Sequence, residues 1–242
     1  MLKVGDVLGR YELVAHLKSG GMATLYLGRP ITPDDNRIFA VKVVHPHFLD
    51  DNELVSMFRA EAGLSQRIKH PNVVHVEEVG ADHGRHFLVM EYVHGCSVAQ
   101  LLQALIRLGR RMSPELAVFI AMAVAEGLHA AHETRGDNGE LLNVVHRDVS
   151  PQNILLSHTG DIRLIDFGVA KSRMRMNHSA TGLSIKGKLR YMAPEHATGK
   201  AVDRRTDVYA LAIVLWEMLT MRPLFWAKTD FDVLTLGRDL RI

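Results

Sequence analysis

The stretch from residue 146 to residue 168 carries three side chains whose types and spacing could support chemistry. It reads HRDVSPQNILLSHTGDIRLIDFG and contains Asp148, Asn153 and Asp166. The runs NILL and DIRLI are apolar and β-prone, and the turn SHTG joins them into a predicted hairpin. This hairpin would bring Asp166 near the loop of Asp148 and Asn153. Such oxygen ligands suit Mg²⁺, and a carboxylate can orient a hydroxyl and accept its proton. The set therefore suits phosphoryl transfer, in which positioning and charge neutralisation dominate.

The order of the motifs around these side chains carries a family resemblance. HRD is followed by Asn153 after four residues and then by DFG, and APE occurs at Ala193 to Glu195. This arrangement resembles the catalytic and metal-binding loops of the eukaryotic-like protein kinases. The resemblance implies an α+β, two-lobed kinase fold with a small β-rich N-lobe and a larger helical C-lobe. The alternative interpretation is a pair of ordinary hairpin aspartates.

The resemblance also implies roles and cofactors. ATP and Mg²⁺ are the expected cofactors, with Asp148 as the catalytic base and Asn153 and Asp166 as the metal ligands. Asp207, in the apolar segment RRTDVYALAIVLWEML, resembles the buried aspartate that holds the catalytic-loop backbone. That role is structural.

The strands expected upstream would position a phosphate-binding loop. Residues 11–29 and 37–44 alternate or form β-branched runs, which predicts strands. Gly20 and Gly21 lie at the tip of the first hairpin, where a backbone without Cβ can approach phosphates closely. An ordinary Gly-Gly hairpin explains the pair when it is taken alone. The loop resembles the kinase glycine-rich loop, with Lys18 and Ala23 at its first and third glycine positions.

Lys42 lies inside the apolar run FAVKVV. A buried ammonium is costly unless it is paired, although a lysine that only reaches out to solvent is the alternative. The helix predicted over DDNELVSMFRAEAGLSQRI carries Glu61. By resemblance, Lys42 holds the α- and β-phosphates and pairs with Glu61. Movement of the helix would break this pair and so act as a switch.

A further group of residues is expected to surround adenine. The strand HFLVMEYVHG runs into a glycine and resembles the hinge between kinase lobes. The resemblance makes Met90 the gatekeeper and brings the backbone of Glu91 and Val93 to the adenine edge. Four apolar side chains would enclose the ring: Leu17, Leu25, Ala40 and Leu155.

The domain organisation follows from the same resemblance. Residues 1–242 are expected to form one kinase domain, with an N-lobe at about 8–93, a hinge at about 91–96 and a C-lobe at about 97–242. Helices are predicted over SVAQLLQALIRLG and from the cap Ser113 to about Thr134, and a short strand is predicted over NVV at 143–145. Kinase domains normally continue for several more helices. The C-lobe is therefore expected to be truncated, as a naturally short kinase or a fragment, and Glu195 to lack its arginine partner.

The polar, basic stretch between DFG and APE resembles the activation segment of kinases. Its candidate phosphorylation sites are Ser179, Thr181 and Ser184. Arg147, just before the catalytic aspartate, can pair with a phosphate in such a loop and order it. We expect autophosphorylation here, with self-association as its route. A flexible surface loop is the alternative interpretation.

Two departures from the Ser/Thr kinase pattern fall in linked positions. Ser150 stands where the family has lysine, and Lys188 stands where it has threonine. In the family these two residues meet beside the catalytic aspartate. We therefore expect Lys188 to supply the charge toward the γ-phosphate that Ser150 cannot supply.

Composition narrows the remaining classes of function. The chain has 242 residues with a formal net charge of +2, and no basic tail or patch indicates a nucleic-acid partner. The single cysteine, Cys96, excludes an internal disulfide framework and fits a reducing compartment. The N-terminus lacks a signal-peptide core, and the longest apolar stretches, near 118–125 and 210–219, are predicted to be buried helices too short to span a bilayer. A cytoplasmic location without a membrane segment is therefore expected.

The motifs and composition together predict an ATP-dependent protein kinase of the bacterial Ser/Thr branch, acting on protein substrates that include itself. The motif set, especially GGM and HRDVSPQN, favours serine or threonine as the acceptor. The competing class is a pseudokinase, a nucleotide-binding or scaffolding module with little transferase activity. The departures at Lys18, Ala23, Ser150 and Lys188 favour that alternative.

Overall fold

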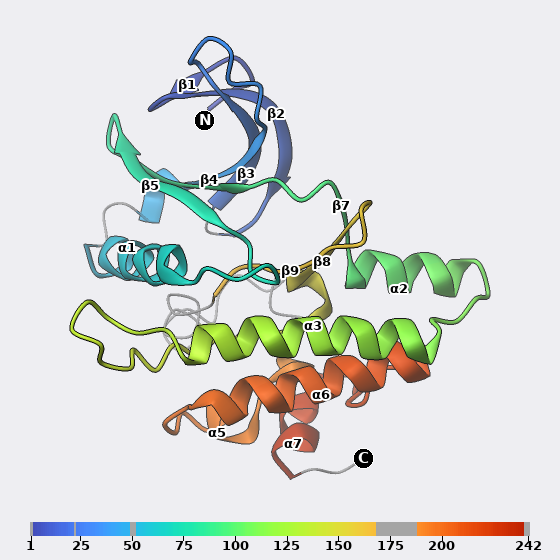
Figure 1. The fold of residues 1–242 in the computed structure, drawn as a ribbon. Helices are drawn as coiled ribbons and strands as arrows, with labels where there is room; N and C mark the ends of the chain where they lie inside the picture. Colours follow the sequence, from blue (N-terminus) through green and yellow to red (C-terminus); the bar gives the residue numbers. More distant parts are fainter. Residues whose placement is uncertain (1, 22, 49–51, 168–187, 240–242) are drawn as a thin grey trace. The chain divides into compact units, whose positions relative to one another are not determined.

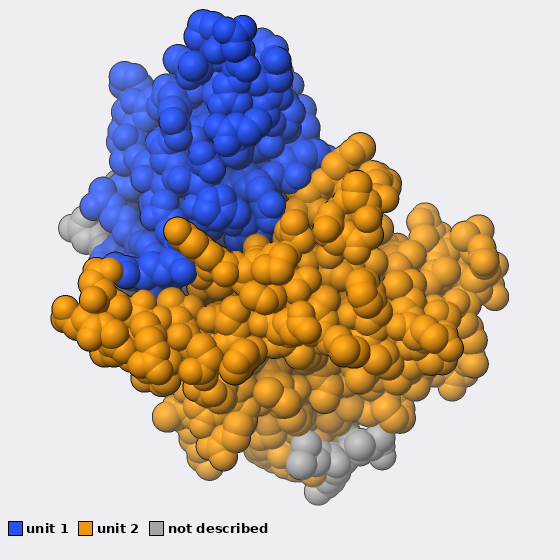
Figure 2. Space-filling view, viewed as in Figure 1, with its two compact units in different colours: residues 1–67, 74–92 blue, residues 68–73, 93–242 orange. Residues whose placement is uncertain are grey.

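The computed structural model describes residues 2–21, 23–48, 52–167 and 188–239. The chain divides into two compact units, coloured separately in Figure 2. Unit 1 comprises residues 1–67 and 74–92, and unit 2 comprises residues 68–73 and 93–242. The candidate phosphorylation sites Ser179, Thr181 and Ser184 lie outside the described residues, as does the side chain of Glu61.

Unit 1 is built on an antiparallel sheet of six strands (Figure 1). The strands are β1 (Val7–Leu8), β2 (Tyr11–Ser19), β3 (Ala23–Pro30), β4 (Phe39–Val44), β5 (Val76–Asp82) and β6 (Arg85–Glu91), in the spatial order β1-β2-β3-β4-β6-β5. A 3₁₀ turn, η1 (Pro46–Phe48), follows β4, and helix α1 (Asn52–Arg67) packs against β5. The strands predicted over 11–29 and 37–44 are therefore confirmed, with a break at the glycine tip.

The core of unit 1 explains why these segments form strands. Inward-facing apolar side chains from five strands form one buried cluster, made of Leu8, Tyr11, Leu13, Tyr26, Phe39, Val41, Val43, Phe87 and Val89. Alternate residues along a strand point to the same face, so Tyr11 and Leu13 reach this cluster together. The strand β4, which carries Lys42, runs through the middle of the sheet.

Unit 2 contains a sheet of three strands that carries the predicted hairpin. Strands β7 (Gly95–Ser97), β8 (Ile154–Ser157) and β9 (Ile162–Leu164) pair antiparallel in that order. Ile154 lies opposite Leu164, and Leu156 lies opposite Ile162. The hairpin predicted from NILL and DIRLI is confirmed.

Helices make up most of the rest of unit 2. They are α2 (Val98–Arg107), α3 (Pro114–His132), α5 (Pro194–Ala197), α6 (Arg204–Thr220) and α7 (Asp230–Asp239), with the 3₁₀ turns η2 (Pro151–Asn153) and η3 (Leu189–Tyr191). Figure 1 shows α3 and α6 lying side by side, and the two pack against each other. The predicted start of α3 is confirmed, because the Ser113 hydroxyl accepts the N–H of Leu116 at 3.2 Å.

The segment 68–73 belongs to unit 2, whereas the predicted N-lobe included it. Its contacts explain the difference. The Asn72 side chain donates to the carbonyl of Ile162 at 3.1 Å, and the Asn72 carbonyl accepts the N–H of Leu164 at 2.8 Å. A Cβ on Gly127 of α3 would lie 2.9 Å from the Asn72 carbonyl oxygen. The absence of a side chain at Gly127 therefore lets this segment lie directly on α3.

Two further expectations differ from the structure. The strand predicted at 143–145 does not form. Asn143 has a left-handed φ of +49°, which a strand does not contain, and the N–H groups that follow the run, on His146 and Arg147, donate to the side chain of Asp207. In addition, α3 is 19 residues long and, by length and composition alone, could cross a membrane. Within unit 2, however, 44% of it is buried. A core helix passes the same test, so α3 is weak evidence for a membrane span.

Candidate active site

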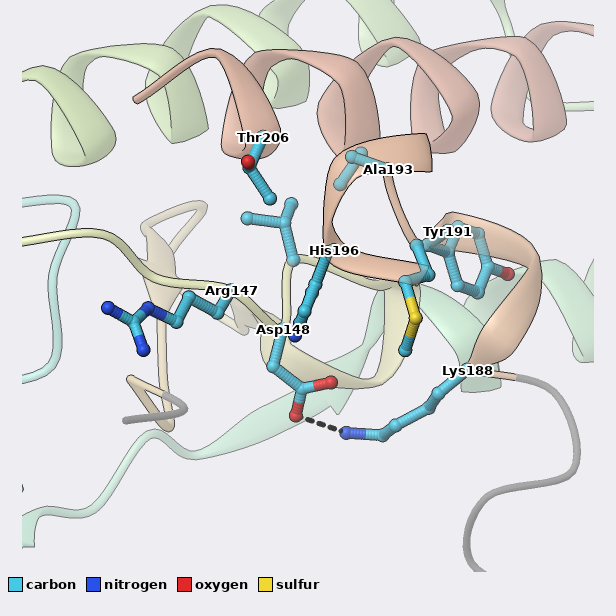
Figure 3. A pocket seen from close by; sticks show the side chains of 10 residues that line it. Arg147, Asp148, Lys188, Tyr191, Ala193, His196 and Thr206 are labelled. Atoms are coloured by element: carbon cyan, nitrogen blue, oxygen red, sulfur yellow. Dashed lines mark hydrogen bonds and ion pairs between the residues drawn. The ribbon is translucent and has the colours of Figure 1, made fainter. Parts of the chain in front are cut away.

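The carboxylate of Asp148 is held from two sides within unit 2. The Asn153 amide donates to the Asp148 carbonyl at 2.7 Å and to its Oδ2 atom at 3.0 Å. The Lys188 ammonium lies 2.7 Å from the same Oδ2 atom, as the dashed line in Figure 3 marks. Asp148 is only 6% exposed. A buried carboxylate needs donors of this kind, and a charged donor makes the stronger hydrogen bond.

The loop between Asp148 and Asn153 is closed by a single 3₁₀ turn. Pro151 occupies the first position of η2, where its missing N–H costs nothing, and the Ser150 carbonyl accepts the N–H of Asn153 at 2.9 Å. Ser150 is 1% exposed, and its Oγ atom has no hydrogen-bond partner among the described residues. An orphaned buried hydroxyl is costly unless a ligand or water completes it.

Asp207 of α6 fixes the backbone immediately before Asp148. Its two oxygens accept the N–H groups of His146 and Arg147, both at 2.8 Å. Arg147 has a φ of +63°, a left-handed conformation that a non-glycine residue rarely adopts without support. The predicted structural role of Asp207 is therefore confirmed.

His132 is a buried residue whose role the sequence motifs do not indicate. Its Nε2 atom lies 2.8 Å from Oδ2 of Asp207, and both side chains are buried. Because a carboxylate oxygen only accepts, the imidazole must carry a proton on Nε2. The partners lie 75 positions apart in sequence, so no local pattern distinguishes His132 from an ordinary packed histidine.

His146 links the loop of Asp148 to the segment that leads to Asp166. Its Nδ1 atom accepts the N–H of Asp148 at 3.2 Å, and its Nε2 atom donates to the carbonyl of Ile165 at 3.0 Å. These partners use both ring nitrogens of a neutral imidazole. The ring centroids of Phe167 and His146 lie 4.5 Å apart. Asp166 follows Ile165 with a φ of +62°.

A second set of contacts holds the turn after Lys188. The Tyr191 hydroxyl donates to Glu217 of α6 in a short hydrogen bond. Burial, followed by the nearby Glu217 charge, raises the pKa of Tyr191 far above its usual value. The carboxylate of Glu195 accepts the Thr206 hydroxyl at 2.6 Å. Glu195, for which no arginine partner is expected, accepts a hydroxyl within unit 2 instead.

The residues predicted to bind ATP belong to both units. Unit 1 carries Leu17 on β2, Leu25 on β3, Ala40 and Lys42 on β4, and Met90 and Glu91 on β6; unit 2 carries Val93 and Leu155. Ala40 and Met90 are buried, and Lys42 is half-buried. The N–H of Glu91 donates to the carbonyl of His75 at 2.9 Å.

The glycine pair of unit 1 lies between β2 and β3. The N–H of Gly20 donates to the carbonyl of Ala23 at 2.9 Å. Neither Gly20 nor Gly21 has a positive φ, and a Cβ on Gly21 would meet nothing within 4 Å. Backbone conformation and packing within the described residues thus do not require glycine here. A ligand that approaches the backbone would require it.

The oxygen-bearing side chains of unit 2 suit a Mg²⁺ ion that is bound to a nucleotide. Among the described residues, no three His, Cys, Asp or Glu side chains form a metal-binding group. Mg²⁺ is typically held by one or two protein oxygen ligands together with substrate phosphates, and so does not need such a group. Asn153 and Asp166 are the residues that would hold it. The orphaned Ser150 hydroxyl is a further polar group that a phosphate oxygen would satisfy.

Comparisons with known proteins agree with this arrangement. A family model described as "Protein kinase domain" matches residues 11–238. The chain is 40% identical to the tyrosine-protein kinase MasK of Myxococcus xanthus, over 93% of this chain and 35% of that protein. It is 33% identical to the serine/threonine-protein kinase PrkC of Bacillus subtilis, over 89% of this chain and 31% of that protein. The chain spans about a third of the length of these relatives.

Solved structures show the same fold. The crystal structure of the Mycobacterium tuberculosis PknI kinase domain matches with a TM-score of 0.70 and 29% identity, over 92% of this chain and 79% of that one. The predicted α+β kinase fold, with a β-rich N-lobe and a helical C-lobe, is therefore confirmed.

Proposed function

This chain belongs to the protein kinase family, and from that premise we propose that it transfers the γ-phosphate of ATP to serine or threonine hydroxyls of protein substrates, itself included. The proposal rests on the contacts that fix the position of Asp148. Two side chains fix its carboxylate, and Asp207 fixes the backbone before it. A base positioned in this way loses little entropy when it meets an acceptor hydroxyl.

Asp148 orients the acceptor hydroxyl and takes its proton as the phosphoryl group is transferred. Asn153 and Lys188 both bind Oδ2 of Asp148 and so fix the orientation of its carboxylate. Lys188 brings a positive charge to the place where Ser150 brings none. We expect its ammonium to stabilise negative charge on the transferred phosphoryl group.

Other residues of the chain hold the nucleotide. Bound Mg²⁺–ATP supplies the transferable phosphoryl group together with a divalent charge. Asn153 and Asp166 are the proposed metal ligands, and Lys42 with Glu61 is the proposed phosphate-holding pair. Gly20 and Gly21 leave backbone open to the phosphates, and the adenine residues are those of the predicted hinge and apolar group.

A nucleotide-binding pseudokinase is the second candidate. The observations that favour it are Lys18 and Ala23 at two glycine positions of the loop, and Ser150 where kinases carry lysine. The contact of Lys188 with Asp148 argues for activity, because it returns a cation to the site.

The proposed type of acceptor residue, serine or threonine, is argued from the relatives as well as from the motifs. PrkC is named as a serine/threonine kinase, whereas MasK is named as a tyrosine kinase. We propose serine and threonine acceptors because HRDVSPQN and the glycine pair resemble the bacterial Ser/Thr branch. A tyrosine acceptor is the alternative that a substrate assay must include.

The setting of the activity is also a proposal. We propose a cytoplasmic domain that acts on proteins and not on nucleic acids, in keeping with its net charge of +2. Self-association would allow one copy to phosphorylate Ser179, Thr181 or Ser184 of another.

One experiment tests the proposal directly. The protein is incubated with labelled ATP and Mg²⁺ beside Asp148→Asn, and phosphoserine, phosphothreonine and phosphotyrosine are separated after hydrolysis. Incorporation on serine or threonine that is lost in Asp148→Asn is the expected result. Nucleotide binding without incorporation would establish the pseudokinase, and label on tyrosine alone would replace the proposed acceptor class.

A further inference from the structure

A set of side-chain hydrogen bonds crosses the base of the loop that carries the glycine pair of unit 1. Nε2 of His16 on β2 lies 2.9 Å from the Ser19 hydroxyl, and that hydroxyl lies 3.3 Å from the hydroxyl of Thr24 on β3. The Thr24 hydroxyl lies in turn 2.9 Å from Nε2 of His45, which follows β4. This hydroxyl network, defined by His16, Ser19, Thr24 and His45, links β2, β3 and β4, which are neighbours in the sheet of Figure 1.

An irregularity in β2 explains why His16 and Ser19 can meet. Alternate residues of a strand share a face, so residues three apart normally point to opposite faces. The pairing of β2 with β3 shifts register between His16 and Lys18. A bulge adds one residue to its strand and so reverses the alternation beyond it. His16 and Ser19 therefore share a face, on which the rings of His16 and Tyr26 also meet edge-on, with their centroids 5.7 Å apart.

The hydroxyl network requires a hydrogen on one of its imidazoles. It contains three hydrogen bonds, and its two hydroxyls supply one hydrogen each. The third hydrogen must therefore come from Nε2 of His16 or of His45, at the two ends of the network. With that tautomer each of the three contacts has one donor and one acceptor.

The hydroxyl network lies on the face of the sheet opposite to Lys42. Residues directly paired across two strands share a face, and Thr24 pairs with Val43 of the buried core. Leu25, the next residue, pairs with Lys42 and so lies on the other face. The network thus anchors the base of the loop and leaves open the face that carries the proposed phosphate-holding lysine.

The tip of the loop has little packing of its own among the described residues. A Cβ on Gly21 would meet nothing within 4 Å, and a Cβ on Gly20 would lie 3.5 Å from the carbonyl oxygen of Ala23. Ser19 and Thr24 form the last pair of β2 and β3 before this tip. A segment with so few packed contacts opens easily, so hydrogen bonds at its base weigh heavily on its position. A loop that is held in its binding conformation also binds its ligand more tightly.

We propose that His16 and His45 are positioning residues for the phosphate-binding loop, which they hold through Ser19 and Thr24. The inference rests on the proposed function, because the glycine pair is proposed to meet the phosphates of ATP. Loss of the network should weaken the binding of the triphosphate and spare the binding of adenosine, which offers the loop no phosphate. A general loss of folding in unit 1 would weaken both ligands alike.

Variants that separate the hydrogen bonds from the packing provide the test. His16→Phe keeps an aromatic ring beside Tyr26 and removes the hydrogen bond, whereas His16→Gln keeps a polar amide near the position of Nε2. Thr24→Val and Thr24→Ser make the same comparison at the hydroxyl. Dissociation constants for a non-hydrolysable ATP analogue with Mg²⁺, and for adenosine, are measured by isothermal titration calorimetry on the whole chain.

The two ligands should respond differently. His16→Phe and Thr24→Val should each raise the dissociation constant of the ATP analogue by roughly threefold to tenfold and change that of adenosine by less than about twofold. His45→Phe should act like Thr24→Val, and His16→Gln and Thr24→Ser should recover most of the loss. His83→Asn is the matched control, because His83 is an exposed histidine between β5 and β6 whose positive φ suits asparagine. It should bind both ligands as the wild type does.

Transfer from labelled ATP, measured in parallel, separates this inference from the proposed function. Selective weakening of the ATP analogue in a chain that transfers no phosphate would support the inference and overturn the proposed activity. Transfer by the wild type, with ATP-analogue binding unchanged in His16→Phe and Thr24→Val, would overturn the inference and leave the proposed activity standing. Equal weakening of both ligands would also overturn the inference.

Discussion

Lys188 stands where the Ser/Thr kinase pattern has threonine, and Ser150 stands where that pattern has lysine. The structure brings the Lys188 ammonium to 2.7 Å from Asp148, while Ser150 stays buried with an orphaned hydroxyl. The side chain of Lys188 is 16% exposed, so its charge is screened less than that of a surface lysine. The expected contact is present, and its part in phosphoryl transfer stays a prediction.

A swap of the two positions tests whether they compensate. Lys188→Thr alone should lower kcat by about tenfold to a hundredfold, because one charged contact near the reacting centre is lost. Ser150→Lys combined with Lys188→Thr should recover most of that loss. Full activity in Lys188→Thr alone would contradict the compensation. Peptide phosphorylation at saturating ATP provides the measurement.

His132 acts on the site only through Asp207, which makes it a positioning residue. His132→Leu would leave a fully buried carboxylate with two of its three donors, at a cost of roughly 1–3 kcal/mol in the free energy of unfolding. We expect kcat to fall while the KM for ATP stays near the wild-type value. His132→Gln, which keeps an N–H donor, should recover part of both losses.

Exposed His129 on the same helix provides the control for His132. His129→Leu should leave urea unfolding and kcat unchanged. Equal effects of the two leucine substitutions would show that the hydrogen bond to Asp207 has no special part in the site.

Tyr191 makes the free energy of unfolding depend on pH in the alkaline range. Its pKa is raised in the folded state, first by burial and then by Glu217, so the folded chain retains the phenol proton more strongly than the unfolded chain. The resulting stability is fully present below about pH 10, the ordinary tyrosine pKa, and is lost as the pH rises above it. The slope contributed by one group is at most about 1.4 kcal/mol per pH unit.

Tyr191→Phe should therefore flatten the decline of the unfolding free energy above pH 10. Urea titrations at several alkaline pH values measure the slope for both proteins. Identical slopes would mean that the shift in the Tyr191 pKa is absent in solution.

At the scale of elements, α3 supports the site because it packs against two neighbouring segments. One contact is the packing against α6, which carries Asp207. The other is the close approach of the segment 68–73, which Gly127 permits. That segment in turn bonds to β9, the strand that leads to Asp166. A single glycine in a helix thus contributes to placing a proposed metal ligand.

Two helical glycines give a matched test of that contact. Gly127→Ala would place a methyl group 2.9 Å from the Asn72 carbonyl oxygen, and should lower the unfolding free energy by about 1–3 kcal/mol. Gly63→Ala in α1 would meet nothing within 4 Å and should raise it by about 0.5–1 kcal/mol, through helix propensity alone. Urea unfolding measures both, and equal effects of the same sign would contradict the packing argument.

At the scale of the whole molecule, the chain folds as two compact units that carry different parts of the predicted machinery. Unit 1 holds Lys42 and the glycine pair, and unit 2 holds Asp148, Asn153 and Asp166. A ligand that binds only the folded chain stabilises it by mass action.

A nucleotide analogue that cannot be hydrolysed, with Mg²⁺ at about a hundred times its Kd, should raise the melting temperature by roughly 5–10 °C. Asp166→Asn and omission of Mg²⁺ should each remove most of this rise. Scanning calorimetry or dye-based melting measures it. An unchanged rise without Mg²⁺ would show that Asn153 and Asp166 do not act through a metal.

Local patterns in the sequence were enough to predict most of the helices and strands. Alternation in β2 and β3, the Ser113 cap of α3 and the SHTG turn are each encoded within a few neighbouring residues. The β-strand prediction was wrong at 143–145, where Asn143 has a φ of +49° and the N–H groups just after the run donate to Asp207, some 60 positions away. Local propensity cannot register such a distant acceptor.

The sequence by itself determined the kinase family and the candidate site residues, because HRD, Asn153 and DFG fix which side chains are available and in what order. Only the tertiary structure decided how these side chains are held. His132 with Asp207, Thr206 with Glu195, and Lys188 with Asp148 are pairs separated by 75, 11 and 40 positions. Burial selects such pairs, since a carboxylate removed from water must find donors wherever the fold supplies them.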